Sequence, residues 1–262
     1  MADDTPYTTQ LQAGLGLVDE TRNLLELWSP GMSASQLHQV ALASGRFPTV
    51  TARRLRNIIY ECFAPRYLVA GGAPAAHLKR LSAGIATADL TQFMLLFTSR
   101  ANPILGDFIR EVYWARYAAG YTEIDNGEAR RFVERCIDDG KTVNRWSEST
   151  VQRISGYLTG CCADYGMLQR GRRTSRKILP FRISAPVAAY LAHALHFSGV
   201  GDNALLTQAD WQLFGLARED VLEALKRLSR DGLLIVQAAG EIVRISWQQP
   251  DLEALCNVLT QG

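Results

Sequence analysis

Apolar side chains recur every three or four positions through most of the first 169 residues. Between residues 51 and 68, the spacing of one helix face is kept by Leu55, Ile58, Ile59, Cys62 and Phe63. The same spacing continues in the segments 15–28, 33–45, 88–97, 102–120, 126–140 and 147–168, which Gly, Pro and Asn separate. No run in this part alternates convincingly as a strand does. We therefore predict an all-helical domain over residues 1–169.

Small polar residues mark helix starts in this domain. Ser33 or Ser35 is expected to cap the helix that ends near Gly45. Ser149 and Gln152 have the spacing of a capping box, in which each side chain bonds the other residue's backbone N–H group. These signals predict where two of the helices begin.

The pattern changes in the last third of the chain. A short helix over 206–215 is followed by a helix that is expected to bury one apolar face and to end at Gly232. That face consists of Val221, Leu222, Leu225 and Leu228. Residues 233–247 then have the pattern of two strands around a turn at Ala239–Gly240. Helix, tight turn, helix and hairpin is the order of a winged helix. We predict a small winged-helix-like α+β domain over residues 184–262, in a protein that is mostly α.

Charge is nearly balanced overall and uneven along the chain. The formal net charge is +2. Residues 1–169 hold 17 basic and 17 acidic side chains, whereas residues 183–262 hold five basic and nine acidic ones. Between these parts, residues 170–182 hold six basic side chains and no acidic one. We predict that residues 170–183 form a basic linker between the two domains.

Two groups of basic residues are candidate contacts for a polyanion. The first group, in the predicted linker, consists of Arg170, Arg172, Arg173, Arg176 and Lys177. The second lies in an acid-free stretch from residue 27 to residue 60 and consists of Arg46, Arg53, Arg54 and Arg56. Because the planar guanidinium group suits bidentate contact with phosphate, both groups favour nucleic acid as the partner. Two other interpretations stay open: the linker docks on the acidic second domain, or it is solvated surface without a partner.

The winged-helix-like domain is a poor candidate for reading a DNA sequence. A reading helix presents its N-terminal part to base edges, and here that part holds Glu219, Asp220 and Glu223. The hairpin tip, residues 237–241, has no Lys or Arg. We therefore expect this domain to serve in packing or protein contact.

Motifs for catalysis and for cofactor binding are absent from the sequence. The chain has no phosphate-binding loop, no dinucleotide-binding glycine motif, no GxSxG and no HExxH. His193 and His196 are three positions apart on a predicted helix, but no Cys, Asp or Glu lies near them in sequence, so we expect no metal site. We expect a non-enzymatic protein with no catalytic residues, no cofactor and no small-molecule substrate.

Several features bear on the compartment. The five cysteines are odd in number and form no CxxC motif, which favours free thiols in a reducing compartment. The N-terminus carries acids and no apolar run of the kind that signal peptides have. Residues 183–201 carry no formal charge, but Pro186, two histidines and the alanine-rich composition favour a buried helix over a membrane span. The prediction is a cytoplasmic protein without a membrane contact.

Four segments of the chain resemble, in order, the BrxA family of bacteriophage-exclusion (BREX) systems. They are LGLVDETRNLLELW, LRNIIYECFAPRYL, ANPILGDFIREVYWARYAAG and WSESTVQRISGYLTGCCADYGML. The segment RISW, residues 244–247, also resembles a short strand near the end of family members. The resemblance implies a first domain similar to the all-helical antitermination protein NusB, and DNA binding within a phage-defence system.

These observations predict a non-enzymatic protein that binds double-stranded DNA mainly through phosphates, with other BREX proteins as partners. We expect weak sequence selectivity because base readout needs placed side chains, and the pattern identifies none. One alternative is a protein–protein adaptor within the defence complex. RNA binding, which the NusB resemblance suggests, is another, although the sequence lacks the exposed-aromatic signature of base-stacking modules.

Overall fold

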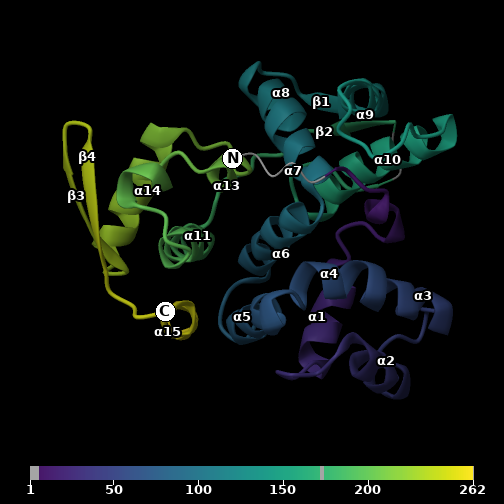
Figure 1. Ribbon diagram of the computed structural model, residues 1–262, viewed down its shortest axis with the longest axis horizontal. Coiled ribbons are helices and arrows are strands. Elements are labelled where there is room, and N and C mark those ends of the chain that lie inside the picture. The colour runs from purple at the N-terminus through teal and green to yellow at the C-terminus, as the bar shows by residue number, and fades with distance from the viewer. Residues whose placement is uncertain (1–5, 172–173, 262) are drawn as a thin grey trace. The chain divides into compact units, whose positions relative to one another are not determined.

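A computed structural model describes residues 6–171 and 174–261, and the chain divides into two compact units (Figure 1). Unit 1 consists of residues 1–76 and 94–181, and unit 2 consists of residues 77–93 and 182–262. The helices α5 (Ala73–Leu81) and α6 (Thr87–Ala101) each contribute residues to both units. Unit 2 therefore includes a segment from the first half of the chain that the sequence pattern does not single out.

Unit 1 is built mainly from helices at the positions that the apolar spacing predicts. Before α5, its elements are η1 (Gln10–Ala13), α1 (Val18–Leu27), α2 (Ala34–Ala43), α3 (Ala52–Asn57), η2 (Ile58–Phe63), α4 (Ala64–Tyr67) and η3 (Ala70–Gly72). After α6, they are α7 (Pro103–Phe108), η4 (Ile109–Tyr113), α8 (Trp114–Ala118), β1 (Glu123–Asp125), α9 (Asn126–Asp138), α10 (Glu148–Asp164) and β2 (Ser175–Lys177).

Two of the predicted helices contain a wider, π-helical turn. Residues 52–67 run from α3 through the π segment η2 into α4. Pro65 is the second residue of α4, just after η2 ends, and because proline has no backbone N–H and its ring crowds the preceding turn, the wider turn makes room for it. Residues 103–118 likewise run from α7 through η4 into α8. Both continuous helices confirm the predictions from apolar spacing.

A two-stranded antiparallel sheet corrects the prediction that the first domain is all-helical. β1 pairs with β2, so that Glu123 lies opposite Lys177 and Asp125 opposite Ser175. The sheet lies beside α8 and α9 (Figure 1). The sequence does not reveal it because three-residue strands are too short to show alternation and the two strands are far apart in the chain.

The helix caps confirm one prediction and correct another. Ser33 caps α2: its Oγ accepts from the N–H of Gln36 at 3.3 Å, and the Gln36 side chain accepts from the N–H of Ser33 at 2.8 Å. In α10, however, the cap is Ser147, whose Oγ accepts from the N–H of Thr150 at 3.4 Å. Ser149 lies inside that helix, which begins earlier than the pair Ser149 and Gln152 predicts.

Unit 2 contains a helix, two short helices, a longer helix and a hairpin. The sequence predicts one short helix over 206–215, whereas the structure has two, over Asp202–Leu205 and Ala209–Gln212; the longer helix and the hairpin follow in the predicted order. Besides its parts of α5 and α6, its elements are α11 (Ala185–Phe197), α12 (Asp202–Leu205), α13 (Ala209–Gln212), α14 (Arg218–Arg230), β3 (Leu234–Ala239), β4 (Ile242–Trp247) and α15 (Leu252–Leu259). The NusB-like and winged-helix-like assignments stay predictions.

The helix α14 and the hairpin provide much of the core of unit 2. Val221, Leu225 and Leu228 of α14 are buried, whereas Leu222, which the sequence predicts on the same face, is half-buried. Gly232 ends the helix with a φ of +75°. In the hairpin, Ala239 lies opposite Ile242, so a loop of Gly240 and Glu241 joins the strands. Gly240 has a φ of +58°, a left-handed conformation that glycine adopts without strain.

The outer edge of β4 is covered by side chains of α12. Asn203 Oδ1 accepts from the N–H of Val243, and Asp202 Oδ2 accepts from the N–H of Ile245, both at 2.9 Å. These carboxyl and amide groups satisfy donors that would otherwise be open to another strand, which protects the hairpin from edge-to-edge pairing.

Candidate nucleic-acid interface

The first basic group lies on a loop that is folded back onto unit 1. Leu168 bridges to Ile178, and the N–H of Gln169 donates to the carbonyl oxygen of Lys177 at 2.9 Å, which closes the loop. Residues 170–171 and 174–181 of the predicted linker belong to compact unit 1. Arg170 and Lys177 are exposed at the two ends of the loop. Arg172 and Arg173 lie outside the described residues.

Arg176 differs from its neighbours because its side chain is half-buried and serves the fold. Its Nη1 donates to the carbonyl oxygens of Gln169 at 3.1 Å and Gly171 at 2.5 Å. The guanidinium group thus holds the two sides of the loop together and is directed at backbone groups. Lys177, the next residue, faces solvent instead because successive side chains of a strand point to opposite sides.

The second basic group is dispersed among local contacts. Arg46 forms an ion pair with Glu26, and Arg54 donates from Nη1 to the carbonyl oxygen of Ala13. The guanidinium carbon of Arg56 lies 5.1 Å from the centre of the Tyr60 ring. Arg53 is exposed, and its side chain makes no hydrogen bond, ion pair or ring contact with the described residues.

One cavity of about 330 Å³ brings together an arginine from each group, Arg54 and Arg170. It is also lined by Asp19, Glu20 and Asp164, so carboxylates outnumber guanidinium groups. Burial raises the pKa of Asp164, whose Oδ2 accepts from the N–H of Gly16 at 2.9 Å. The balance of charge does not suit a phosphate. Arg54 donates to the backbone before α1, at Ala13, whereas Arg170 donates to the carbonyl oxygen of Asp164 at the end of α10.

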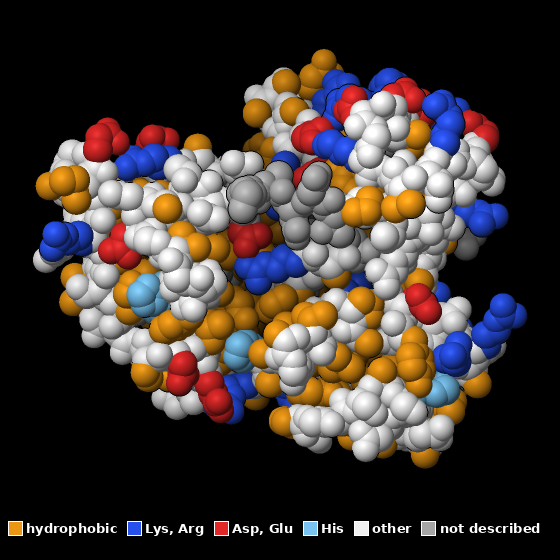
Figure 2. All heavy atoms as spheres, viewed as in Figure 1, with side chains coloured by type: hydrophobic (Ala, Val, Ile, Leu, Met, Phe, Trp, Pro, Cys, Tyr) orange, Lys and Arg blue, Asp and Glu red, His pale blue; other side chains and the backbone are white. Residues whose placement is uncertain are grey.

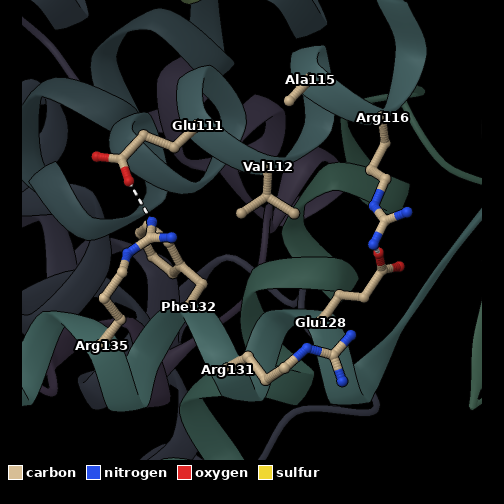
Figure 3. Close-up of a pocket in the computed structure, with 8 residues that line it drawn as sticks. All are labelled: Glu111, Val112, Ala115, Arg116, Glu128, Arg131, Phe132 and Arg135. Atoms are coloured by element: carbon tan, nitrogen blue, oxygen red, sulfur yellow. Dashed lines mark hydrogen bonds and ion pairs between the residues drawn. The ribbon is translucent and has the colours of Figure 1, made fainter. Parts of the chain in front are cut away.

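A further cluster of arginines, which the sequence pattern does not single out, lines a pocket of about 290 Å³ between η4, α8 and α9 (Figure 3). Arg116 comes from α8, and Arg131 and Arg135 come from α9. Val112 and Phe132 are among the apolar residues that line the pocket, and Figure 3 shows the Arg116 and Arg135 side chains on opposite sides of Val112.

The three arginines differ in how far acids neutralise them. Arg116 forms an ion pair with Glu128, and Arg135 forms one with Glu111. Arg131 is exposed and has no acid partner among the described residues. Basic and acidic side chains are intermingled over this part of unit 1 (Figure 2). The net charge of residues 1–169 gives no sign of this cluster because acids and bases are equal in number there. The four-residue spacing of Arg131 and Arg135 is the signal that could have shown it, because it places both on one helix face.

This pocket is linked to the first basic group through the small sheet, because β1 lies between α8 and α9 in sequence and pairs with β2. Lys177 lies opposite Glu123 in the sheet, and the carbonyl oxygen of Thr122 accepts from the N–H of Ile178 at 2.8 Å. Tyr121 precedes Thr122, and the guanidinium carbon of Arg116 lies 4.1 Å from the centre of its ring. We call Arg116, Arg131, Arg135 and Lys177 the basic corner. Arg116 and Lys177, which lie 61 positions apart in sequence, thus belong to one candidate interface.

In unit 2, the first turn of α14 is acidic and partly engaged in local contacts. Asp220 Oδ2 accepts from the N–H of Ala217 at 3.0 Å, and Glu223 forms an ion pair with Lys226 at 2.7 Å. Arg218, at the first position of the helix, pairs with Glu241 of the hairpin loop at 3.4 Å. The acidic surface that the sequence predicts is therefore present at the start of this helix.

His193 and His196 both pack against Trp247. The His196 ring is stacked on the Trp247 ring, with centres 4.3 Å apart and planes inclined by 14°, and the His193 ring meets it edge-on. His193 Nδ1 lies 2.8 Å from the carbonyl oxygen of Ala189. Within residues 6–171 and 174–261, no three His, Cys, Asp or Glu side chains gather as they would around a metal ion.

Comparison with known proteins gives the family. Residues 5–194 match the model of the BrxA family, which is more than half of the chain. The chain belongs to the BrxA family. It is therefore a component of a BREX phage-defence system, and such systems contain several proteins.

Structural comparison supports the fold of this BrxA-family chain. A crystal structure of an uncharacterized protein from Magnetospirillum magneticum is similar, with a TM-score of 0.58 and 15% sequence identity. The match covers 77% of this chain and 96% of that protein. No curated protein matches the sequence. In the described part of the chain, no helix has both the length and the apolar character that crossing a bilayer requires.

Proposed function

We propose that this BrxA-family protein is a non-enzymatic DNA-binding component of its BREX system and contacts duplex DNA mainly through phosphates. The observation that carries the proposal is the exposure of Lys177, which belongs to the acid-free segment 170–182 and lies on β2. β2 pairs with β1, the strand between the two helices that supply the arginines of the pocket. Arg131 and Lys177 have no acid partner among the described residues and so supply cations that can contact phosphate.

The test is a charge-removal variant that leaves the fold intact. Arg170, Arg172, Arg173 and Lys177 are changed together to Gln, while Arg176 is kept because it holds the loop closed. A matched control removes four charges from unit 2, at Lys226, Arg227, Arg230 and Arg244, all of which are exposed. Binding of a labelled duplex is followed by fluorescence anisotropy over a series of salt concentrations.

Each phosphate contact contributes about 0.9 to the slope of log K against log salt. The first variant should bind more weakly on every duplex sequence, with a slope shallower by about 1 to 4. The control should keep the affinity and the slope of the parent. Equal losses in both variants would mean that net charge alone governs binding, and an unchanged first variant would remove the segment from the interface.

The non-enzymatic part of the proposal has a separate test. Purified protein is assayed for nuclease, nucleotide hydrolase and methyltransferase activity, and we expect none because the sequence contains no motif for these reactions. Turnover that a point substitution in this chain abolishes would overturn this part.

A second candidate function, contact with another protein of the BREX system, is favoured by the outer face of the hairpin. Ile235 and Ile242 are 48% and 62% exposed, and both belong to the face opposite the buried Val243 and Ile245. Changing both to Thr should leave DNA binding intact and reduce co-purification with the other proteins of the system. Unchanged co-purification would count against this role.

A further inference from the structure

Two tyrosines are held at the end of α8 by a defined turn. Gly120, with a φ of +75°, donates its N–H to the carbonyl oxygen of Tyr117 at 3.1 Å, and Tyr121 donates to that of Arg116 at 3.0 Å. This pair of bonds is the Schellman arrangement, which satisfies the last carbonyl groups of a helix. Tyr117 and Tyr121 are therefore fixed on either side of one turn.

Both rings are open to solvent. Tyr117 is 40% exposed and Tyr121 is 54% exposed, and in the described part of the chain Phe197 is the one other aromatic side chain with comparable exposure. Tyr117 packs against Trp114, with ring centres 5.3 Å apart, so an aromatic neighbour supports it from within the helix. Because both rings are exposed, filling the core of unit 1 does not account for them.

Cations and carboxylates are mixed beside the two rings. The cations can contact single phosphates of a nucleic-acid backbone, but the carboxylates would repel a long row of them. The Arg116 guanidinium carbon lies 4.1 Å from the centre of the Tyr121 ring, and Lys177 lies on the strand that pairs with the residues after Tyr121. Glu123 and Glu128 are also close: Glu123 lies opposite Lys177, and Glu128 pairs with Arg116. Stacking of a neutral base on a ring tolerates such mixed charge better than a row of phosphates does.

We infer that Tyr117 and Tyr121 form a stacking site for the unpaired bases of single-stranded DNA, beside the duplex contacts of the basic corner. The inference rests on the proposed nucleic-acid function and adds to it a preference for DNA with an unpaired segment. Arg116 covers Tyr121 and contributes a cation next to the strand, as arginines do in single-strand channels.

The experiment compares a short oligo(dT) strand, an oligo(U) strand of the same length and a fully paired duplex. The variant changes Tyr117 and Tyr121 together to Leu, which removes the rings and retains apolar bulk. A second variant changes both to Phe, which retains stacking. The control is Phe197→Leu, which removes an exposed ring of 39% exposure from unit 2. Circular dichroism establishes that each variant is folded.

The double Leu variant should lose about 5- to 100-fold in affinity for oligo(dT), while the Phe variant and the Phe197 control keep it. Its affinity for the duplex should stay within about 2-fold of the parent, because phosphate contacts do not use the rings. An oligonucleotide that carries 2-aminopurine should show quenched fluorescence with the parent and not with the Leu variant.

Failure of this inference is distinct from failure of the proposed function. A Leu variant that binds oligo(dT) as the parent does would overturn the stacking site, whether or not the duplex binds. A parent that binds oligo(dT) through its tyrosines but does not bind the duplex would refute the duplex proposal and support the stacking site. Equal binding of oligo(U) supports stacking without sugar selectivity, whereas binding of oligo(U) alone overturns the assignment to DNA.

Discussion

Arg66 donates from Nη2 to the carbonyl oxygen of Gly14 at 3.1 Å, across the interior of unit 1. Its Nη1 makes a second bond of the same length to the carbonyl oxygen of Leu15. The side chain is 3% exposed, and among the described residues no carboxylate forms an ion pair with it. A buried guanidinium group thus holds the backbone segment that leads into α1.

This contact predicts that Arg66→Met destabilises the protein by about 2 to 4 kcal/mol, because two buried carbonyl oxygens lose their donors. Urea unfolding followed by circular dichroism measures the change. Arg54→Gln is the matched comparison: Arg54 also donates to a carbonyl oxygen, that of Ala13, but it is exposed and should cost less than about 1 kcal/mol. Equal stability of both variants would show that the two buried bonds of Arg66 contribute no more to stability than the exposed bond of Arg54.

Substitution by Gln should destabilise the protein at Arg176 and leave its stability almost unchanged at the adjacent Lys177. Arg176→Gln removes the bonds to Gln169 and Gly171 and should lower the free energy of unfolding by about 1 to 2 kcal/mol. Lys177→Gln should leave stability within about 0.5 kcal/mol of the parent, because the side chain is exposed. Thermal unfolding and duplex titration, applied to both variants, separate the two roles. A stable Arg176 variant would contradict its part in closing the loop.

Leu225 is a core residue of unit 2, and its truncation should be costly. Leu225→Ala leaves a cavity under α14 and should destabilise the protein by about 2 to 5 kcal/mol. Glu223→Gln on the same helix loses one exposed ion pair, with Lys226, and should cost less than about 1 kcal/mol. The Gln variant should also bind duplex DNA as well as the parent or slightly better. Loss of sequence-selective binding in that variant would make α14 a reading helix.

Acidification should destabilise the protein through His193. Burial lowers the pKa of His193 below its ordinary value of 6.5, and burial has the same effect on His77. Below about pH 6.5 the unfolded chain binds protons that the folded chain resists, so this contribution to stability is present at neutral pH and is lost as the pH falls through 6.5.

Urea unfolding at about pH 7.5 and about pH 5.5 measures the effect. His193→Gln keeps a side-chain donor for the carbonyl oxygen of Ala189 and does not titrate, so the difference in stability between the two pH values should shrink. If the variant retained the full pH dependence of the parent, other groups would be responsible.

The local features of the fold could be predicted from the sequence because their causes act over a few residues. The apolar spacing of Val221, Leu225 and Leu228 is that of α14, and all three are buried. Ser33 caps α2, and Gly232 ends α14, as their chemistry predicts. The four helical segments that resemble the BrxA family likewise led to the family that the comparison shows.

Contacts between distant parts of the chain were decided by the tertiary structure. The pairing of β1 with β2 joins two strands that are too short to be recognised and lie far apart in sequence. The membership of residues 77–93 in unit 2 depends on the packing of side chains such as Phe93 against Tyr190, with ring centres 5.2 Å apart. No local pattern contains this information.

The candidate site likewise has some features that the sequence determined and others that only the tertiary structure decided. The sequence determined that residues 170–182 carry six cations and no acid, which is a property of composition. Only the tertiary structure decided that Arg176 bonds backbone carbonyl groups and that Arg170 and Arg54 meet three carboxylates. It also decided that the strand of Lys177 pairs with the strand that follows Tyr121, on whose ring Arg116 packs. A charge contacts phosphate only if it is exposed and not already paired, and both conditions depend on neighbours that folding brings from other parts of the chain.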